Sequence, residues 1–194
     1  MAYTLLGSLT SPFVRRVRLA MDNIPYDFKE LNIYDNAEGA AYLHKINPVH
    51  QIPVLIDGEK SIWDSRVILQ YLNEKHKLET QSWEKENLLT AIDGAINSGV
   101  VLFLSKRSGL SIDEPTMYFQ RQRDRLESIM DYLKPHLQSP AAKEWNFVNM
   151  SLYAMIDWLS TRSMMNFSGR PECHHFLETH SQRPVVQLTQ IPKT

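Results

Sequence analysis

Cysteine is nearly absent from this sequence: Cys173 is the single thiol among 194 residues. One cysteine excludes an intramolecular disulfide and is typical of proteins from a reducing cytoplasm. An excess of charge of one sign is also missing, since 21 basic and 22 acidic side chains leave a formal net charge of -1. This balance gives no overall attraction to nucleic acid or to acidic membranes.

Long hydrophobic runs are also lacking, because no apolar stretch approaches the roughly 20 residues that cross a bilayer. The opening residues, MAYTLLGS, carry no charged leader, so we expect no signal peptide. His174 and His175 follow Cys173, but no second cluster is available to complete a tetrahedral metal site. We therefore expect a globular protein without a bound metal.

The first part of the chain alternates the patterns of strands and helices. Ser11 has the chemistry of a helix N-cap, and Pro12 suits the first helical position, where its missing N–H is no loss. The Asp57-Gly58 pair between two β-rich runs predicts a hairpin. The expected strands are Tyr3–Leu6, Tyr26–Leu31, Ile52–Ile56 and Lys60–Trp63, and the expected helices begin at Ser11 and Asp64, with one weak helical patch at residues 40–46.

After Leu78 the pattern becomes helical, and no convincing strand occurs from Trp83 until near the C-terminus. The expected helices cover residues 83–106, 115–136, 146–165 and 171–181. The sequence thus predicts a small α/β domain at residues 1–77, with the element order βαβ-ββα, followed by an all-α domain at residues 83–194.

Two stretches of the first domain carry a specific spacing. They are Ser11-Pro12-Phe13-(x)2-Arg16-Val17-Arg18-(x)-Ala20, and Asn47-Pro48-(x)3-Ile52-Pro53-Val54-Leu55-(x)2-Gly58 followed by Asp64-Ser65-Arg66-(x)2-Leu69-(x)-Tyr71-Leu72. Together they resemble the N-terminal domain of the cytosolic glutathione S-transferases, and the first resembles the serine-type members. The resemblance implies a thioredoxin-like domain and a helical bundle that contributes the electrophile pocket. It also implies a cytoplasmic homodimer with a role in detoxification.

The second domain resembles this superfamily more loosely. Members usually begin the central helix with a Ser/Thr-x-x-Asp capping box, whereas here the corresponding residues are Asn146-Phe147-Val148-Asn149. Asparagine caps a helix about as well as serine, and Asn149 can reach back to a backbone amide. The departure indicates a divergent, bacterial-type member.

The resemblance implies a site for glutathione as co-substrate. Asp64 and Ser65, at a helix start, offer an anion to the γ-glutamyl amine and hydroxyl and N–H donors to its carboxylate. Ile52, if Pro53 is cis, would present its backbone to the cysteinyl part. Gln51 stands where many members have a lysine, so glutathione affinity should be weaker than usual. Phe13 completes the expected glutathione-binding residues.

The predicted catalytic residue is Ser11, which would donate a hydrogen bond to the glutathione sulfur and favour its thiolate. A plain N-cap worth about 1 kcal/mol is the alternative. Ser8 and Thr10 are neighbouring hydroxyls that would serve if the loop register differs. Tyr3 is a further candidate, although its place within a strand favours the core.

Three arginines in the first helix, Arg15, Arg16 and Arg18, could strengthen the field at the sulfur, although long basic side chains on a helix usually form a solvated face. Candidates for the electrophile pocket, by position only, are Asn97, Val101 and Ser105, whereas Trp158 is expected to pack.

The leading functional hypothesis is therefore a glutathione transferase acting on small electrophiles. The alternative is a non-catalytic partner-binding protein of the same fold, since Trp63-Asp64-Ser65-Arg66 followed by Ile68 also resembles stringent-starvation-type regulators. A thiol–disulfide oxidoreductase is set aside, because Ser11 occupies the position where that chemistry needs cysteine.

Overall fold

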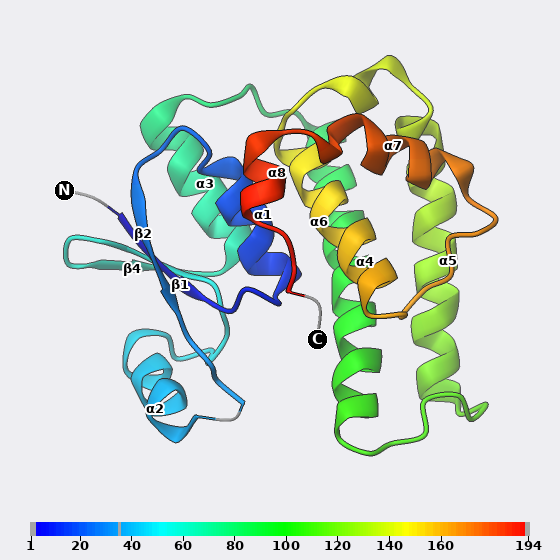
Figure 1. The fold of residues 1–194 in the computed structure, drawn as a ribbon, viewed down its shortest axis with the longest axis horizontal. Helices are drawn as coiled ribbons and strands as arrows, with labels where there is room; N and C mark the ends of the chain where they lie inside the picture. Colours follow the sequence, from blue (N-terminus) through cyan, green and yellow to red (C-terminus); the bar gives the residue numbers. More distant parts are fainter. Residues whose placement is uncertain (1–2, 35, 193–194) are drawn as a thin grey trace. The chain divides into compact units, whose positions relative to one another are not determined.

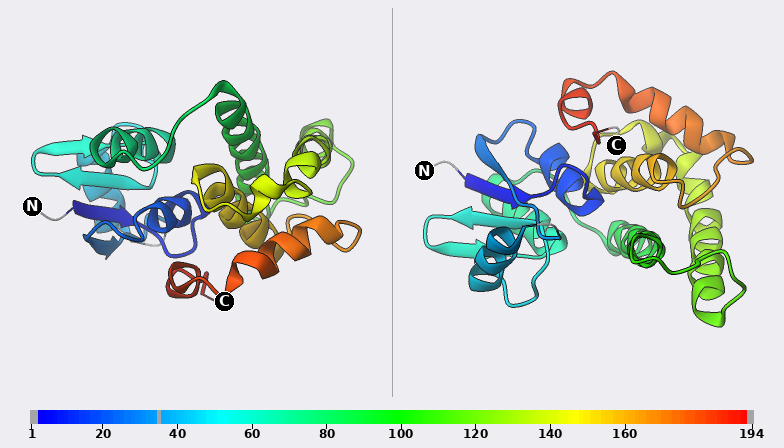
Figure 2. Two further views of the ribbon diagram at one scale, coloured as in Figure 1. Left: turned by 90° about the horizontal axis from the view of Figure 1, so that it is seen from above. Right: turned by 60° about the horizontal axis from the view of Figure 1, so that its bottom comes forward.

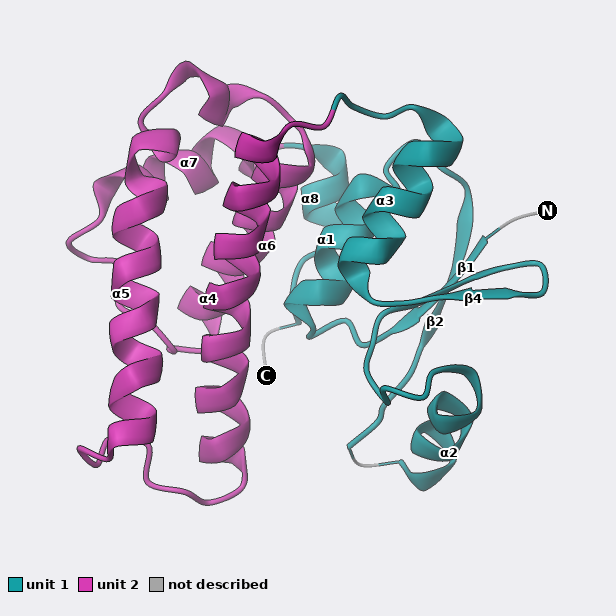
Figure 3. Ribbon diagram, turned by 180° about the vertical axis from the view of Figure 1, so that it is seen from behind, with its two compact units in different colours: residues 1–80, 183–194 teal, residues 81–182 magenta. Residues whose placement is uncertain are grey.

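The chain forms two compact units (Figure 3). The computed structural model describes residues 3–34 and 36–192. Unit 1 contains residues 1–80 together with 183–194, and unit 2 contains residues 81–182. The predicted division at 1–77 and 83–194 therefore differs at the C-terminal segment, which belongs to the first unit rather than the second.

A four-stranded sheet organises unit 1 (Figure 1). Its strands are β1 (Tyr3–Gly7), β2 (Tyr26–Glu30), β3 (Val54–Asp57) and β4 (Lys60–Ile62), in the order β2-β1-β3-β4. β1 pairs with β2 in parallel, and the β1–β3 and β3–β4 pairs are antiparallel. The third strand begins at Val54 instead of the predicted Ile52, because proline has no N–H for the ladder and so delays the start of pairing.

The two faces of the sheet carry separate apolar clusters, as the period of two along each strand requires. Leu5 and Leu55 lie in one cluster with residues of α1 (Pro12–Ala20) and α3 (Ser65–His76). Leu6 and Val54 lie in the other with Leu43 of α2 (Ala37–Ile46). Helices thus cover both faces, and the thioredoxin-like α/β architecture predicted for the first domain is confirmed.

The helix α2 is longer than the weak patch predicted at residues 40–46. Asn36 caps it, because its side-chain Oδ1 accepts from the N–H groups of Glu38 at 2.9 Å and Gly39 at 3.2 Å. Gly39 is buried with its Cα against the Asn32 carbonyl, where a Cβ would lie 2.4 Å from that oxygen. A glycine required by close packing lowers helical propensity, so the sequence pattern underestimated this helix.

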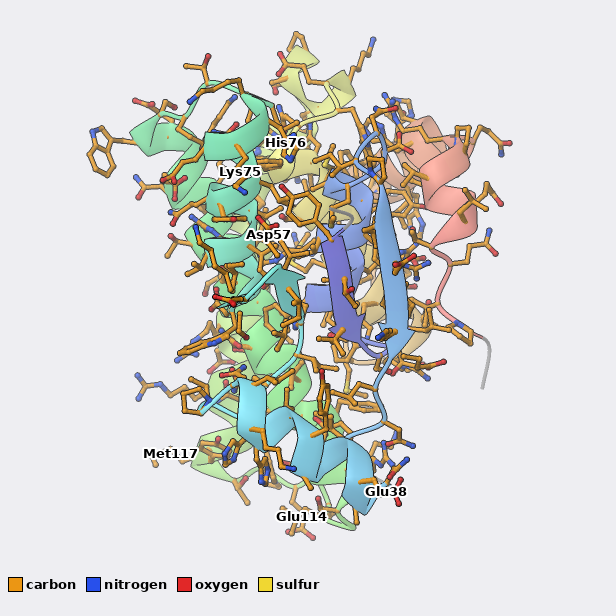
Figure 4. The ribbon with its side chains drawn as sticks, turned by 90° about the vertical axis from the view of Figure 1, so that its left-hand side faces the viewer. Glu38, Asp57, Lys75, His76, Glu114 and Met117 are labelled. Carbon is orange, nitrogen blue, oxygen red and sulfur yellow. The ribbon has the colours of Figure 1, made fainter. Side chains whose placement is uncertain are left out.

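The turn between β3 and β4 is fastened to α3 by one carboxylate (Figure 4). Asp57 Oδ2 accepts from Tyr71 Oη at 2.5 Å and from Lys75 Nζ at 2.5 Å. The Lys75 hydrogen bond, followed by that from Tyr71, holds the pKa of Asp57 below its ordinary value. The predicted Asp57-Gly58 hairpin is confirmed, with Gly58 at φ +61°.

The C-terminal segment adds a helix that the sequence did not predict, α8 (Pro184–Leu188). It packs on α1, where Arg18 Nη2 donates to the Leu188 carbonyl at 3.2 Å. Val185 and Val186 are buried there. This packing explains why residues 183–194 belong to unit 1.

Unit 2 is all-helical, as predicted. It contains α4 (Trp83–Arg107), α5 (Met117–Leu137), the 3₁₀ turn η1 (Pro140–Lys143), α6 (Phe147–Thr161) and α7 (Pro171–Ser181). The helix α6 is buried along most of its length and lies between α4 and α7 in both views of Figure 2. Gly99 allows α4 to approach α6, since a Cβ there would lie 2.4 Å from Leu159 Cδ2.

The helix α4 is also long and apolar enough to span a membrane, with a mean hydropathy of 1.6 over its most apolar window. This finding corrects the expectation that no such apolar run exists. Length and composition are weak evidence here, because core helices of globular proteins pass the same test, and α4 packs against α5 and α6.

The start of α6 confirms the asparagine cap, since Asn146 Oδ1 accepts from the Asn149 N–H at 3.0 Å. The Asn149 side chain was predicted to bond back to a backbone amide, but its hydrogen bonds go to other groups. Its Nδ2 donates to the carbonyls of Ala141 at 2.7 Å and Glu144 at 2.9 Å, and its Oδ1 lies 2.8 Å from His136 Nε2. This buried amide therefore fastens η1 and α5 to α6.

Candidate functional site

Ser11 begins the first helix of unit 1, and its side chain caps it. Ser11 has an extended backbone (φ -86°, ψ 127°), its Oγ accepts from the Val14 N–H at 3.3 Å, and Pro12 is the first helical residue. Accepting this bond uses a lone pair of the hydroxyl and leaves its single hydrogen for another acceptor. The half-buried hydroxyl thus stands at the positive end of a helix, and the cap does not use its hydrogen.

The alternative hydroxyls are engaged with other partners. Ser8 Oγ and Thr10 Oγ1 lie 2.9 Å apart, and the Thr10 N–H donates to Ser8 Oγ at 3.2 Å. Tyr3 is buried in the core, and its Oη lies 2.9 Å from Nε2 of His76, at the C-terminal end of α3. Burial, as the main cause, raises the pKa of Tyr3, which disfavours its use as a phenolate.

The segment between α2 and β3 is held by a buried asparagine. Asn47 Nδ2 donates to the Gln51 carbonyl at 2.7 Å, and its Oδ1 accepts from the Val49 N–H at 2.9 Å. The Ile52–Pro53 peptide bond is cis. Gln51 is exposed, and Ile52 lies before the first paired residue of β3. The sequence pattern contained Asn47 but assigned it no part in holding this segment.

Asp64 and Ser65 stand at the N-terminus of α3, as predicted. Asp64 Oδ1 accepts from the Arg66 N–H at 2.8 Å and from the Val67 N–H at 3.3 Å, so the carboxylate caps the helix while remaining exposed. The Trp63–Asp64 peptide bond is cis. Ser65 is buried, and its Oγ accepts from two guanidinium nitrogens of Arg16, Nε at 3.1 Å and Nη2 at 2.6 Å.

The arginines of α1 do not form the solvated face that was expected. Arg15 is 2% exposed and Arg16 is 1% exposed. The Arg16 guanidinium carbon lies 5.2 Å from the centre of the Phe13 ring, so it links two residues of the predicted glutathione site, Phe13 and Ser65. Arg18 lies in the last turn of α1, away from Ser11, with its guanidinium over Phe28 and on the Leu188 carbonyl.

These residues lie in a recognisable domain. A family model described as "Glutathione S-transferase, N-terminal domain" matches residues 5–80. Residues 5–80 are therefore similar to the N-terminal domain of the glutathione S-transferases. Glutathione S-transferase U8 of Arabidopsis thaliana is similar to the chain, with 41% identity over 76 residues, which are 38% of this chain and 33% of that protein. The matches to curated Arabidopsis transferases of this kind span about a third of the relatives' length.

Proteins that match a larger share of the chain have a lower sequence identity to it. A zeta-class glutathione S-transferase of Euphorbia esula is 27% identical over 191 residues, covering 89% of this chain and 82% of that protein. Among solved structures, a glutathione S-transferase of Methylobacterium radiotolerans in complex with glutathione sulfonate has a TM-score of 0.85 at 20% identity. It covers 100% of this chain and 96% of the other, and it supports the glutathione S-transferase fold of both units.

In the helical unit of this transferase fold, the three electrophile-pocket candidates all lie on α4. Asn97 is exposed, and Val101 and Ser105 are half-buried. Trp158 is 2% exposed with its ring centre 5.6 Å from that of Phe103, so its expected packing role is confirmed. A cavity of about 380 Å³ within unit 2 is lined instead by residues of α5, η1 and α7.

The region of the single cysteine is structural. Cys173 is 0% exposed, and burial raises the pKa of its thiol to about 12. The neighbouring His174 bonds through Nε2 to the Phe167 carbonyl at 3.0 Å. Within the residues that the structure describes, no group of three or more histidine, cysteine or acidic side chains is placed to hold a metal ion.

Proposed function

We propose that this protein is a serine-type glutathione transferase that joins the glutathione sulfur to small electrophiles. The observation that carries the proposal is the position of Ser11, a hydroxyl at the N-terminus of α1 in a glutathione S-transferase N-terminal domain. Proteins with the same fold are found in complex with glutathione or glutathione sulfonate, which supports glutathione as the ligand. We expect a cytoplasmic homodimer, with no nucleic acid or membrane as partner.

The proposed chemistry begins at the glutathione thiol. The Ser11 O–H donates to the sulfur, and the helix N-terminus adds a favourable field, so the thiol loses its proton to solvent near neutral pH. The thiolate lone pair then forms a bond to an electrophilic carbon, while the leaving group departs with its bonding pair.

Glutathione itself would be held by the remaining predicted residues. The hydroxyl and the backbone N–H of Ser65 would receive the γ-glutamyl carboxylate, and Asp64 would receive the amine. A carboxylate has about four acceptor sites, so the capping bonds to Oδ1 do not exhaust Asp64. Ile52 would pair its backbone with the cysteinyl part, and Gln51 would donate without a charge.

The test is calorimetry with glutathione, followed by conjugation assays on a panel of electrophiles. Two substitutions separate the role of the hydroxyl in catalysis from its role in capping the helix. Ser11→Ala removes the hydroxyl and lowers helix stability, whereas Ser11→Gly removes the hydroxyl but costs only a few tenths of a kcal/mol of helix stability. We expect both to reduce turnover at least tenfold with little change in glutathione affinity. Absence of glutathione binding at millimolar concentration would refute the transferase and leave a non-catalytic binding protein.

A further inference from the structure

The cavity of about 380 Å³ in unit 2 lies where three segments of the helical unit pack together. The C-terminal end of α5, the turn η1 and the first turns of α7 contact one another (Figure 1) and line it. The buried apolar part of its lining consists of Leu137, Ala142 and Phe176. Sites for small molecules have volumes of about 300–1,000 Å³, so the cavity is large enough for a compact organic ligand.

The sequence of α7 places a carboxylate on the same helix face as this apolar lining. Glu172 lines the cavity, and so do the residues three, four and seven positions after it, His175, Phe176 and Thr179. Residues at these spacings share one face of an α-helix. Glu172 is 9% exposed, so its side chain lies with this face in the interior rather than in solvent.

The Glu172 carboxylate is not compensated by the protein around it. Within the part of the chain that the structure describes, no group donates a hydrogen bond to this carboxylate and no cation forms an ion pair with it. Arg170, two positions earlier, is paired with Glu127 and Asp131 of α5 instead. Burying a carboxylate without hydrogen bonds is costly, whereas the N-terminus of α7 favours its ionised form. The cavity therefore contains a poorly hydrated anion with unused acceptor sites.

We propose that this cavity is a binding site for a primary amine with a compact apolar body. An ammonium group brings three N–H donors and a positive charge, and Glu172 supplies the acceptors and the opposite charge. The apolar body would lie against Leu137, Ala142 and Phe176. The residues of this cavity belong to unit 2, whereas those of the proposed glutathione site belong to unit 1, so the inference does not depend on the proposed function.

Two basic side chains of the lining, Lys143 and His175, are exposed. Exposed charges are hydrated and screened by salt, so they act on a ligand more weakly than a buried carboxylate does. They define the competing ligand, an organic acid that pairs with Lys143. The Lys143→Gln variant distinguishes the two ligands, because it removes an attraction for an acid and a repulsion for an amine.

The experiment is calorimetry with phenethylamine and with hydrocinnamate, which share a phenylethyl body and differ in the sign of their charge. The wild-type protein should bind phenethylamine saturably at millimolar concentration, and hydrocinnamate about tenfold more weakly or less. Glu172→Gln keeps the size of the side chain but removes its charge, so it should weaken phenethylamine binding about tenfold. Glu178→Gln, at an exposed residue of α7 outside the cavity lining, is the matched control and should leave the dissociation constant unchanged. Lys143→Gln should not weaken phenethylamine binding.

A second measurement uses the wild-type protein alone and covers the case in which Glu172→Gln does not fold. Phenethylamine should shift the backbone amide resonances of the segments that line the cavity, residues 137–143 and 171–179, whereas hydrocinnamate at the same concentration should not. Equal affinity for the two ligands, phenethylamine binding that Glu172→Gln leaves unchanged, or shifts confined to other segments would overturn the proposal. Absence of saturable phenethylamine binding would overturn it too, and so would tighter hydrocinnamate binding that Lys143→Gln abolishes.

Discussion

Adding one methyl group at Gly7 tests whether the packing of β1 against α1 positions Ser11. Gly7 ends β1 beside Val14, whose N–H is the donor to Ser11 Oγ. A Cβ at Gly7 would lie 2.4 Å from Val14 Cγ2, 2.8 Å from Cγ1 and 3.2 Å from Cβ, whereas ordinary contacts begin at 3.4 Å. Val14 is 0% exposed and β-branched, so no other rotamer in the helix relieves the overlap.

The size of the effect follows from these distances. Overpacking in a dense core costs about 1–3 kcal/mol, and a contact shorter than the ordinary limit by about an ångström belongs in the upper half of that range. The gain from restricting the unfolded chain with alanine is about 0.4–1 kcal/mol. Gly7→Ala should therefore lower the free energy of unfolding by about 2 kcal/mol, and it should reduce turnover because Val14 and the capped Ser11 move together.

A double variant identifies the overlap as the cause. Val14→Ala alone removes both short-contact methyl carbons and should cost about 2 kcal/mol. In the Gly7→Ala/Val14→Ala variant the new methyl occupies the vacated space, so the combined cost should fall well below the sum of the two. Urea unfolding of the four proteins gives the coupling free energy, expected at about 1.5–2 kcal/mol. Additive costs, or a Gly7→Ala variant as stable as wild type, would refute this reasoning.

Three further predictions concern unit 2. Gly99→Ala should lower the free energy of unfolding by about 1–3 kcal/mol, because the new Cβ would lie 2.4 Å from Leu159 Cδ2. The matched Gly94→Ala on the same helix places its Cβ 3.2 Å from one methyl group and should be near neutral. Equal effects of the two substitutions in urea unfolding would count against the close approach of α4 to α6. Asn149→Leu should cost about 2 kcal/mol, since it leaves two part-buried carbonyls without their donor, and a thermal unfolding midpoint equal to that of wild type would contradict this. Cys173, with its pKa raised to about 12, should stay protonated at pH 8 and react with a chromogenic disulfide reagent only after denaturation; rapid reaction in the native protein would show that the thiol is accessible.

Local chemistry explains most of what the sequence predicted correctly. Ser11 and Pro12 start a helix because a serine hydroxyl can accept a hydrogen bond from an unpaired N–H of the first turn, and proline has no N–H that would need a partner. Asn146 caps α6 for the same reason. Short β-rich runs, with alternation at residues 26–31, correctly located the strands of unit 1, although the start of β3 moved to Val54 because of Pro53. Such signals act within a few residues and can be read from a single sequence.

The parts that the sequence did not predict depend on contacts between distant segments. In the sequence, Arg16 looks like part of a solvated helix face, whereas in the structure the approach of Ser65, 49 positions later, gives it a buried hydrogen-bond partner. The position of α8 on α1 likewise depends on how the C-terminal segment returns to unit 1. The full length of α2 was hidden by Gly39, which close packing requires and helix propensity disfavours.

The central claim is that Ser11 stabilises the thiolate of bound glutathione. The most direct measurement is a pH titration of the thiolate ultraviolet absorbance of glutathione bound to the wild-type protein and to Ser11→Gly, which keeps the helix nearly as stable. We predict that the thiol pKa of bound glutathione lies below that of free glutathione in the wild-type complex, and that it returns toward the free value in Ser11→Gly. The same pKa in both complexes would contradict the claim and reduce Ser11 to a helix cap.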